Sequence, residues 1–334
     1  MAQDPADIWA MSDLATPFAV RTVATLRVAD VVKDGPVGVA ELAQQCDAQA
    51  DPLGRILRFL VQRGLFSEPE TDVFGPNAAS RVLEDDDPRG VRAWLDLDGA
   101  IGRADLALVE LIEQVRGHHS AYSTAFGRSF WEDLAQNAEL SESFDNLMES
   151  KTYGLGPSVA AAYDWSRFDR VVDVGGGKGA LIAEILHAHP TVRGVVVDLP
   201  GPAGHAEEYL AERGVQDRAE IVPGDFFREL PPGADAYVLC DVLGDWDDAD
   251  ATRILSRCAE AGAAEASTLI VEMMPEDDDM ETFTEMDLRM MVYVGGRMRD
   301  LERTRSVVAA AGLFIGDVTE LEDGYRIIEC LPDR

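Results

Sequence analysis

The segment 170–200 constrains the fold of this chain more than any other part of the sequence. It reads RVVDVGGGKGALIAEILHAHPTVRGVVVDLP. An apolar run at 171–174 ends in glycines, a helical pattern follows, and a second apolar run at 195–197 ends in Asp198. A strand, a glycine turn, a helix and a strand with a terminal acid make half of a nucleotide-binding α/β unit. Glycines allow a ligand to approach the backbone, and the acid can bind ribose hydroxyls.

The glycine turn also narrows the choice of nucleotide. A Walker phosphate loop requires Ser or Thr where this chain has Gly179, and a dinucleotide turn requires glycine where Ala180 stands. The remaining pattern, Asp173 followed by Gly175 and Gly177, resembles the Asp-x-Gly-x-Gly-x-Gly signature of S-adenosylmethionine (SAM) methyltransferases. The alternative is a tight turn that binds nothing.

Composition excludes several partners. The 334 residues carry a formal net charge of −33, which argues against nucleic acid and anionic membranes as partners. The four cysteines lie far apart, so we expect free thiols in a reducing compartment and no metal site. No leader-like apolar run and no 18-residue apolar stretch occur, and we expect a cytoplasmic protein.

The spacing of apolar residues divides the chain into three predicted parts: 1–90, 91–164 and 165–334. Residues 1–90 show helical spacing over 7–32, two short helices at about 39–45 and 52–63, and a small β wing, which together outline a winged helix. This part has fifteen acidic and eight basic residues, so we expect it to mediate dimerisation rather than to bind DNA. Residues 91–164 read as a helical linker that contributes to a substrate pocket. The acidic runs 84–87 and 276–279 and the histidines at 118–119 are interpreted as solvated loops.

Residues 165–334 alternate strands and helices. This pattern predicts a Rossmann-like domain with a mostly parallel, seven-stranded sheet, so the fold class is α/β. Ligands of such sheets bind at the carboxyl ends of the strands. The residues at those predicted ends are Gly175, Asp198, Asp225, Cys240 and Glu272.

With these residues placed, the whole chain resembles the small-molecule O-methyltransferases of the plant caffeate type and their bacterial polyketide-tailoring relatives. The matching stretches are Asp-Val-Gly-Gly-Gly at 173–177, Asp-Leu-Pro at 198–200, Gly-Asp-Phe-Phe at 224–227, Asp-Trp-Asp-Asp at 245–248, and Asp-Leu-Arg-Met at 287–290 before Gly-Gly at 295–296. The resemblance implies a homodimer joined through its N-terminal domain, with SAM as cofactor and S-adenosylhomocysteine (SAH) as product. It also implies that Asp198 binds the ribose, that Asp225 and Phe226 hold the adenine, and that Cys240 and Trp246 lie along the cofactor.

Two departures from this family concern the reaction itself. Methylating members have a general-base His before Asp-Trp, where this chain has Gly244, and a carboxylate that orients the base, where this chain has Met298. The second orienting carboxylate remains as Glu272. We therefore expect Asp245 and Glu272 to be the polar groups near the reacting atom, although a helix cap and a solvated strand end are the simpler interpretations.

The candidates for an aromatic substrate pocket are Gly244 and the side chains of Met148, Met290 and Tyr293. The alternative for these side chains is packing in the core.

The favoured function is methyl transfer to an aromatic, polyketide-like hydroxyl of natural-product biosynthesis, by proximity and orientation. A phenol has a pKa of about 10 and is scarcely ionised at neutral pH. A base contributes roughly 10²- to 10⁴-fold, whereas alignment supplies several kcal/mol. The anthracycline methyltransferases, which this pattern resembles, also lack the His. The alternatives are a relative without methyl transfer (a decarboxylase, hydroxylase or pericyclase) and a regulatory protein with a winged-helix head.

Overall fold

The computed structural model describes residues 5–117, 120–274, 280–321 and 324–333. Residue contacts divide the chain into two compact units, with the boundary between Arg103 and Ala104. The three-part division into 1–90, 91–164 and 165–334 remains a prediction. The histidines at 118–119 and the acidic run 276–279 lie outside the described residues.

The N-terminal unit combines short helices with a three-stranded antiparallel sheet of order β1-β3-β2. Its helices are α1 (Pro5–Met11), α2 (Ala15–Thr25), α3 (Val28–Val32), α4 (Val39–Gln45), α5 (Ala50–Val61) and α6 (Val91–Leu95), and its strands are β1 (Val37–Gly38), β2 (Ser67–Glu70) and β3 (Val73–Gly75). Leu42, Leu57, Leu60 and Phe74 are fully buried in its core. The two helices and the wing follow the sequence prediction.

The helical spacing over 7–32 does not form one helix. The Asp13 carboxylate accepts a hydrogen bond from the amide of Ala15 at 2.9 Å and so starts α2 separately from α1. Arg27 adopts a left-handed conformation with φ of 54°, which ends α2 before α3 begins. The apolar periodicity continues across the break at Arg27 because α2 and α3 bury apolar residues in the same core, whereas Ile8, Trp9 and Met11 of α1 are exposed.

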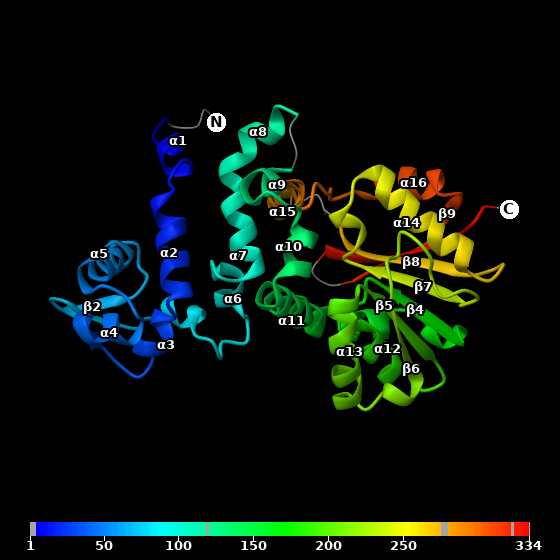
Figure 1. Cartoon of the computed structure of the whole chain (residues 1–334), viewed down its shortest axis with the longest axis horizontal. Coiled ribbons are helices and arrows are strands. Elements are labelled where there is room, and N and C mark those ends of the chain that lie inside the picture. Colours follow the sequence, from blue (N-terminus) through cyan, green and yellow to red (C-terminus); the bar gives the residue numbers. More distant parts are fainter. Residues whose placement is uncertain (1–4, 118–119, 275–279, 322–323, 334) are drawn as a thin grey trace. The chain divides into compact units, whose positions relative to one another are not determined.

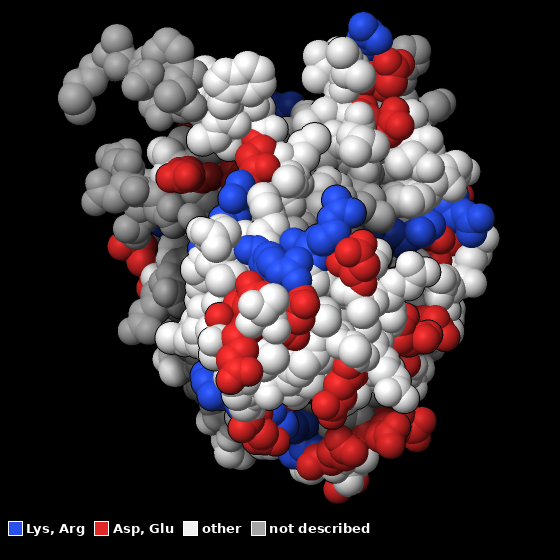
Figure 2. Space-filling view, turned by 90° about the vertical axis from the view of Figure 1, so that its left-hand side faces the viewer, with Lys and Arg blue, Asp and Glu red and all other residues white. Residues whose placement is uncertain are grey.

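Charge is mixed on the face of the N-terminal unit that carries α4, α5 and β2. Figure 2 shows acidic and basic side chains interspersed over this face, and basic residues do not dominate it. Several are paired: Arg58 contacts Glu68 at 3.2 Å and also pairs with Asp72.

The second unit contains a seven-stranded sheet of order β6-β5-β4-β7-β8-β10-β9. The strands are β4 (Arg170–Val174), β5 (Arg193–Asp198), β6 (Ala219–Pro223), β7 (Ala236–Cys240), β8 (Ser267–Met273), β9 (Leu313–Glu320) and β10 (Tyr325–Pro332). The first five are parallel, and β10 pairs antiparallel with both β8 and β9. The predicted mostly parallel, seven-stranded α/β fold is confirmed.

Helices cover both faces of this sheet (Figure 1). Val171 and Val196 pack with α11 (Ala138–Ala162), α12 (Ala180–Ala188) and α13 (Pro200–Glu212) on one face. Val172 and Val195 pack with α14 (Asp248–Ala261) and α16 (Leu301–Ala310) on the other. Consecutive strand residues therefore enter opposite cores, which explains why both strands carry apolar residues at consecutive positions.

The remaining helices of the chain are α7 (Ala100–Asp105), α8 (Leu111–Val115), α9 (Ala121–Phe126), α10 (Phe130–Gln136) and α15 (Met280–Tyr293). Gln114 connects two of these segments, because its side chain donates to the carbonyl oxygen of Met291 and accepts from the amide of Ala121. Among the described residues, each helix is too short or too polar to cross a lipid bilayer.

Candidate active site

The residues predicted at the strand ends meet at one edge of the sheet. Strands β5, β4, β7 and β8 are neighbours and run parallel, so their carboxyl ends lie side by side. These ends carry Asp198, Gly175, Cys240 and Glu272. The sheet order therefore brings together residues that are almost one hundred positions apart in the sequence.

The backbone of the glycine turn after β4 can come close to neighbouring groups because its glycines have no side chains. Gly175, Gly177 and Gly179 have φ values of +75°, +56° and +82°, a region that favours glycine. A Cβ on Gly175 would lie 2.9 Å from a methyl carbon of Val242 and 3.6 Å from the Phe226 ring. The turn thus contacts the segments that follow β6 and β7, which leaves no room for a side chain.

Two carboxylates lie beneath this turn, the half-buried Asp198 and the buried Asp173. Asp198 accepts a hydrogen bond from the amide of Gly177 at 2.8 Å, and burial raises the pKa of Asp198 to about 6. Asp173 is fully buried, and no hydrogen bond reaches its Oδ2 within the described part of the chain. Burial, followed by the charge of Asp198, raises the pKa of Asp173 to about 7. Such a pair favours a ligand with hydroxyl donors and positive charge.

An aromatic cluster adjoins the turn. Phe226 and Phe227 pack edge-on against Trp246, with ring centroids 5.9 and 4.6 Å from it. Asp225 is half-buried and accepts a hydrogen bond from the amide of Phe227 at 2.9 Å. Cys240 is half-buried at the end of β7, and burial raises the pKa of its thiol. Aromatic faces beside a carboxylate suit a flat heterocycle that carries an amino group.

Gly244 lies against both Glu272 and Met298. A Cβ on Gly244 would be 3.3 Å from Glu272 Oε2 and 3.3 Å from Met298 Sδ. Glu272 Oε1 accepts hydrogen bonds from the amides of Leu243 and Gly244, at 2.8 and 3.2 Å. The structure therefore brings together the two positions that depart from the family pattern, Gly244 and Met298, and the carboxylate that is kept, Glu272.

The carboxylates around Gly244 have raised pKa values. Burial, followed by the charge of Asp241, raises the pKa of Glu272 to about 7. Burial, followed by the charge of Glu272, raises the pKa of Asp245 well above its usual range. Asp245 is on the same loop as Gly244, in the short helical turn Leu243–Asp245. Neighbouring acids with perturbed pKa values are typical of functional sites.

Sequence reasoning missed Arg299, which holds the Gly244 loop in place. This buried arginine donates to the carbonyl oxygens of Leu243 and Trp246, both at 2.7 Å, and to Asp248 at 3.0 Å. A Cβ on Gly296 would lie 2.3 Å from the carbonyl oxygen of Gly244, so glycine is needed there. No spacing in the sequence signals this role, because it depends on the packing of Gly296 against the loop.

The sequence analysis also missed Lys151 and Asp241. The Lys151 ammonium lies 2.9 Å from the Asp241 carboxylate, which also accepts from the Tyr325 hydroxyl at 3.2 Å. Asp241 directly follows β7 and has a left-handed φ of 54°. The chain has only three lysines, and two of them, Lys151 and Lys178, lie near the site on α11 and in the glycine turn. The scarcity of lysine in this chain was the sequence feature that could have drawn attention to Lys151.

The candidates for the substrate pocket are not equivalent. Met148 on α11 and Met290 on α15 are half-buried. Tyr293 is buried, and its hydroxyl bonds to Asp105 and accepts from Arg289 Nη1 at 2.8 Å. The Tyr293 hydroxyl therefore has polar partners in the helical region.

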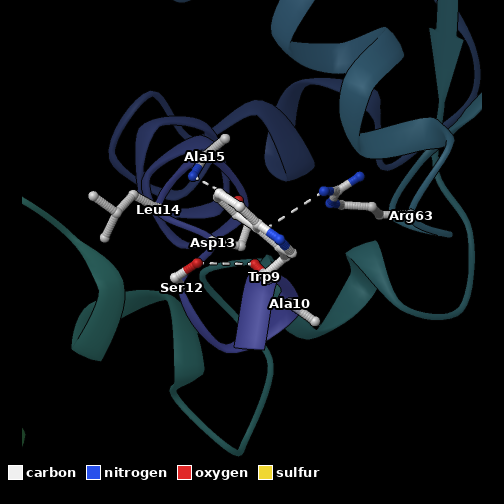
Figure 3. A pocket seen from close by; sticks show the side chains of 7 residues that line it. All are labelled: Trp9, Ala10, Ser12, Asp13, Leu14, Ala15 and Arg63. Carbon is white, nitrogen blue, oxygen red and sulfur yellow. Dashed lines mark hydrogen bonds and ion pairs between the residues drawn. The ribbon is translucent and has the colours of Figure 1, made fainter. Parts of the chain in front are cut away.

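A separate hollow lies in the N-terminal unit and contains none of these residues. It is lined by Trp9, Ala10, Ser12, Asp13, Leu14, Ala15 and Arg63. Figure 3 shows Arg63 reaching toward Asp13, at 3.5 Å, beside the Trp9 indole. Trp9 is 82% exposed, Met11 75% and Leu14 71%. This hollow is part of an exposed apolar surface rather than of the strand-end site.

Comparison with known proteins connects both units to described families. A family model described as an O-methyltransferase domain matches residues 107–314, and one described as an O-methyltransferase dimerisation domain matches residues 10–85.

Individual relatives match over nearly their whole length. A 2,7-dihydroxy-5-methyl-1-naphthoate 7-O-methyltransferase of Streptomyces carzinostaticus is 45% identical over 92% of this chain and 92% of that protein. Aclacinomycin 10-hydroxylase RdmB of Streptomyces purpurascens is 38% identical over 91% of this chain and 83% of that protein. The crystal structure of NcsB1, an O-methyltransferase from neocarzinostatin biosynthesis bound to SAM and 2-hydroxy-5-methyl naphthoic acid, superimposes with a TM-score of 0.91 at 43% identity, covering 96% of this chain and 97% of that one.

Proposed function

We propose, since this chain belongs to the O-methyltransferase family, that it methylates a hydroxyl group of a naphthoate-like aromatic substrate in antibiotic biosynthesis. The cofactor is SAM, which the NcsB1 relative binds. The observation that carries the proposal is the strand-end cradle, in which the glycine turn lies against Asp198 and Phe226. The substrate class comes from relatives that act on naphthoates or bind them.

The residues of the cradle fit SAM. Asp198 is placed to accept hydrogen bonds from ribose hydroxyls, and Asp225 with Phe226 to hold the adenine. The buried Oδ2 of Asp173 has no hydrogen-bond partner among the described residues, so a positively charged, donor-rich ligand would satisfy it. Gly175 and Gly177 bring the backbone close to the ligand, and Cys240 and Trp246 flank it.

When bound, SAM supplies a methyl group that a positively charged sulfur already activates for displacement. The chain has no side chain at position 244, so no imidazole can accept the substrate proton there. Alignment of the hydroxyl with the methyl group is therefore the main contribution that we assign to this protein, worth roughly 7–11 kcal/mol in the best cases. Met148, Met290 and Tyr293 are proposed to shape the aromatic pocket, with Asp245 and Glu272 as its polar groups.

The N-terminal unit is proposed to form a homodimer. The dimerisation-domain match at 10–85 supports this assignment, as do the exposed apolar side chains of α1 and the start of α2. A contiguous exposed apolar surface is typical of a subunit interface. On this basis we retain 1–90 as the dimerisation part, 91–164 as the helical pocket region and 165–334 as the SAM-binding part.

A second function belongs to the same fold. The relative RdmB is described as a 10-hydroxylase, and Gly244 and Met298 depart from the pattern of base-containing methyltransferases. A SAM-binding enzyme that hydroxylates or decarboxylates its substrate, or that acts as a pericyclase, is therefore the alternative.

Methyl-labelled SAM with a panel of hydroxynaphthoates separates the two functions. The proposal expects label in the product and one SAH for each product molecule. A change in substrate mass without label transfer, while SAM stays intact, would instead establish the alternative.

A further inference from the structure

We propose that Glu272 itself accepts the proton of the substrate hydroxyl, because the absence of a side chain at Gly244 leaves Glu272 Oε2 accessible. This inference rests on the proposed methyl transfer and names the base that the transfer would use. By resemblance, Glu272 only orients a base. Here the glycine makes it the group that contacts the substrate.

The two oxygens of Glu272 have different surroundings. Oε1 is fixed by the amides of Leu243 and Gly244. Oε2 receives no hydrogen bond from the described residues, and it faces the position that a Cβ on Gly244 would take. Among the described residues, and apart from the two chain neighbours of Gly244, only Oε2 and Met298 Sδ lie within 4 Å of that position. We infer that the substrate hydroxyl, or one bridging water, approaches Oε2 past Gly244, where no side chain stands in the way, and makes a hydrogen bond of about 2.5–3.0 Å.

This space is close to the cofactor cradle. Val242, two residues before Gly244, provides the methyl carbon that a Cβ on Gly175 would meet at 2.9 Å. The loop that carries Gly244 therefore touches the glycine turn directly. Arg299 fixes the loop through the Leu243 and Trp246 carbonyl oxygens, so Oε2 has a defined position relative to the cradle.

The charges around Glu272 suit a base that works near neutral pH. Burial raises its pKa to about 7, and the Asp241 carboxylate also raises it. The Gly244 and Leu243 amides and the Lys151 ammonium act in the opposite direction. A base whose pKa lies near the working pH is partly ionised and still accepts a proton well.

Other ionisable groups pack around Glu272. Arg299 and the Cys240 thiol lie on neighbouring segments, and their pKa values respond to the Glu272 charge. Arg326 is the cross-strand partner of Glu272 on β10 and pairs with Glu320. Burial and the Glu272 charge raise the pKa of Asp245 well above its usual range.

The proton and the electrons balance in a single displacement. The O–H bond of the substrate breaks and its proton forms a bond to Oε2. The electron pair left on oxygen makes the new bond to the methyl carbon, and the pair of the broken carbon–sulfur bond stays on sulfur. Glu272 then releases the proton to water.

The test compares the pH dependence of kcat in the wild type and in Glu272→Gln. We expect an acidic limb near pH 7 in the wild type. We expect Glu272→Gln to lose that limb and to lower kcat roughly 10²-fold or more, with SAH affinity by calorimetry within a factor of three of the wild type. The matched control is Glu329→Gln, which changes a buried glutamate of β10 that accepts from Ser267 at 2.7 Å, and we expect it to keep the wild-type profile.

A second readout does not depend on turnover. Carbon-13 NMR of labelled glutamate carboxyls, assigned with Glu272→Gln, reports the pKa of Glu272 directly. Asp241→Asn removes a neighbouring negative charge, so the NMR pKa and the acidic limb should move to lower pH together. A limb that stays in place while the NMR pKa moves would assign the base to another group.

Gly244→Ala tests the access route and serves if Glu272→Gln does not fold. Its methyl group fills the space in front of Oε2, and we expect at least a tenfold loss of kcat with unchanged SAH binding. The inference is overturned if Glu272→Gln or Gly244→Ala transfers methyl at the wild-type rate with the wild-type pH profile. A wild-type enzyme that forms no SAH with any hydroxynaphthoate would instead refute the proposed function.

Discussion

Arg299 Nη1 donates a hydrogen bond to the carbonyl oxygen of Leu243 at 2.7 Å, which joins the segment before α16 to the loop after β7. The same guanidinium also reaches Trp246 and Asp248. The loop that carries Gly244 and Asp245 is therefore held by a planar group with several donors, an arrangement that lysine cannot reproduce.

Arg299→Lys should destabilise the protein and disorder this loop. The substitution leaves the buried carbonyl oxygen of Leu243 and the part-buried one of Trp246 without their donor, so we expect a loss of about 2–4 kcal/mol in the free energy of unfolding. Urea denaturation measures it. Arg303→Lys is the control, because the exposed Arg303 side chain pairs with the same Asp248 and should change stability by less than about 1 kcal/mol. Equal effects of the two substitutions would contradict a clamping role for Arg299.

Asp173 should make the ligand-free protein less stable as pH rises. Its folded pKa of about 7 lies above the ordinary value of 3.8, so between these values the native state binds more protons than the unfolded state. The stability that this group contributes is present below pH 4 and is lost as pH rises to 7. Asp173→Asn removes this dependence, and we expect the difference in Tm between pH 5 and pH 8 to shrink by several degrees.

Asp317→Asn provides the comparison for that measurement, since Asp317 is exposed on β9 and carries the same formal charge. Its difference in Tm between the two pH values should match that of the wild type. A wild-type-like difference in Asp173→Asn as well would show that the Asp173 carboxyl is not the responsible group.

Gly175→Ala should separate backbone strain from cofactor binding. Gly175 and Gly214 have similar φ values, +75° and +69°, so alanine at either position should lower stability by about 1–2 kcal/mol. Only Gly175 would place its Cβ against another segment, 2.9 Å from Val242. Calorimetry should show SAH affinity reduced at least tenfold in Gly175→Ala and unchanged in Gly214→Ala. Similar SAH affinities in both variants would show that the cofactor does not bind at this turn.

Leu14→Asp should dissociate the proposed homodimer. Leu14 is exposed beside Trp9 and Met11, and a charge there opposes burial in an interface. Sedimentation analysis should show a monomer, or a dimer weakened at least a hundredfold. Phe314→Asp, on the exposed edge strand β9, is the comparison and should leave the association state unchanged. A dimer that survives Leu14→Asp would place the interface elsewhere.

Much of the sheet could be predicted from the sequence because it depends on local patterns. The runs at 171–174 and 195–197 are apolar on both faces, and Asp198 and the glycines mark where the strands end. The strand ends could be placed together because parallel neighbours share an edge. The helical breaks at Asp13 and Arg27 could not be predicted, since the apolar periodicity continues across them.

The contacts around Gly244 depend on tertiary structure. Arg299 is 55 residues from Gly244 in sequence, and its role follows from the packing of Gly296 against the loop, which no spacing in the sequence encodes. Lys151 reaches Asp241 from a helix that precedes the sheet. The raised pKa of Glu272 likewise follows from burial and from the nearby Asp241, both of which require the folded chain.

The position of β10 between β8 and β9 has a consequence for synthesis on the ribosome. Strand β8 is made well before its neighbour β10 (Tyr325–Pro332), which lies near the end of the chain. Until β10 pairs with it, β8 presents a row of unpaired amide and carbonyl groups, the kind of edge that recruits strands from other chains. The nascent protein is therefore most prone to aggregation late in translation, when most of the sheet exists and its closing strand does not.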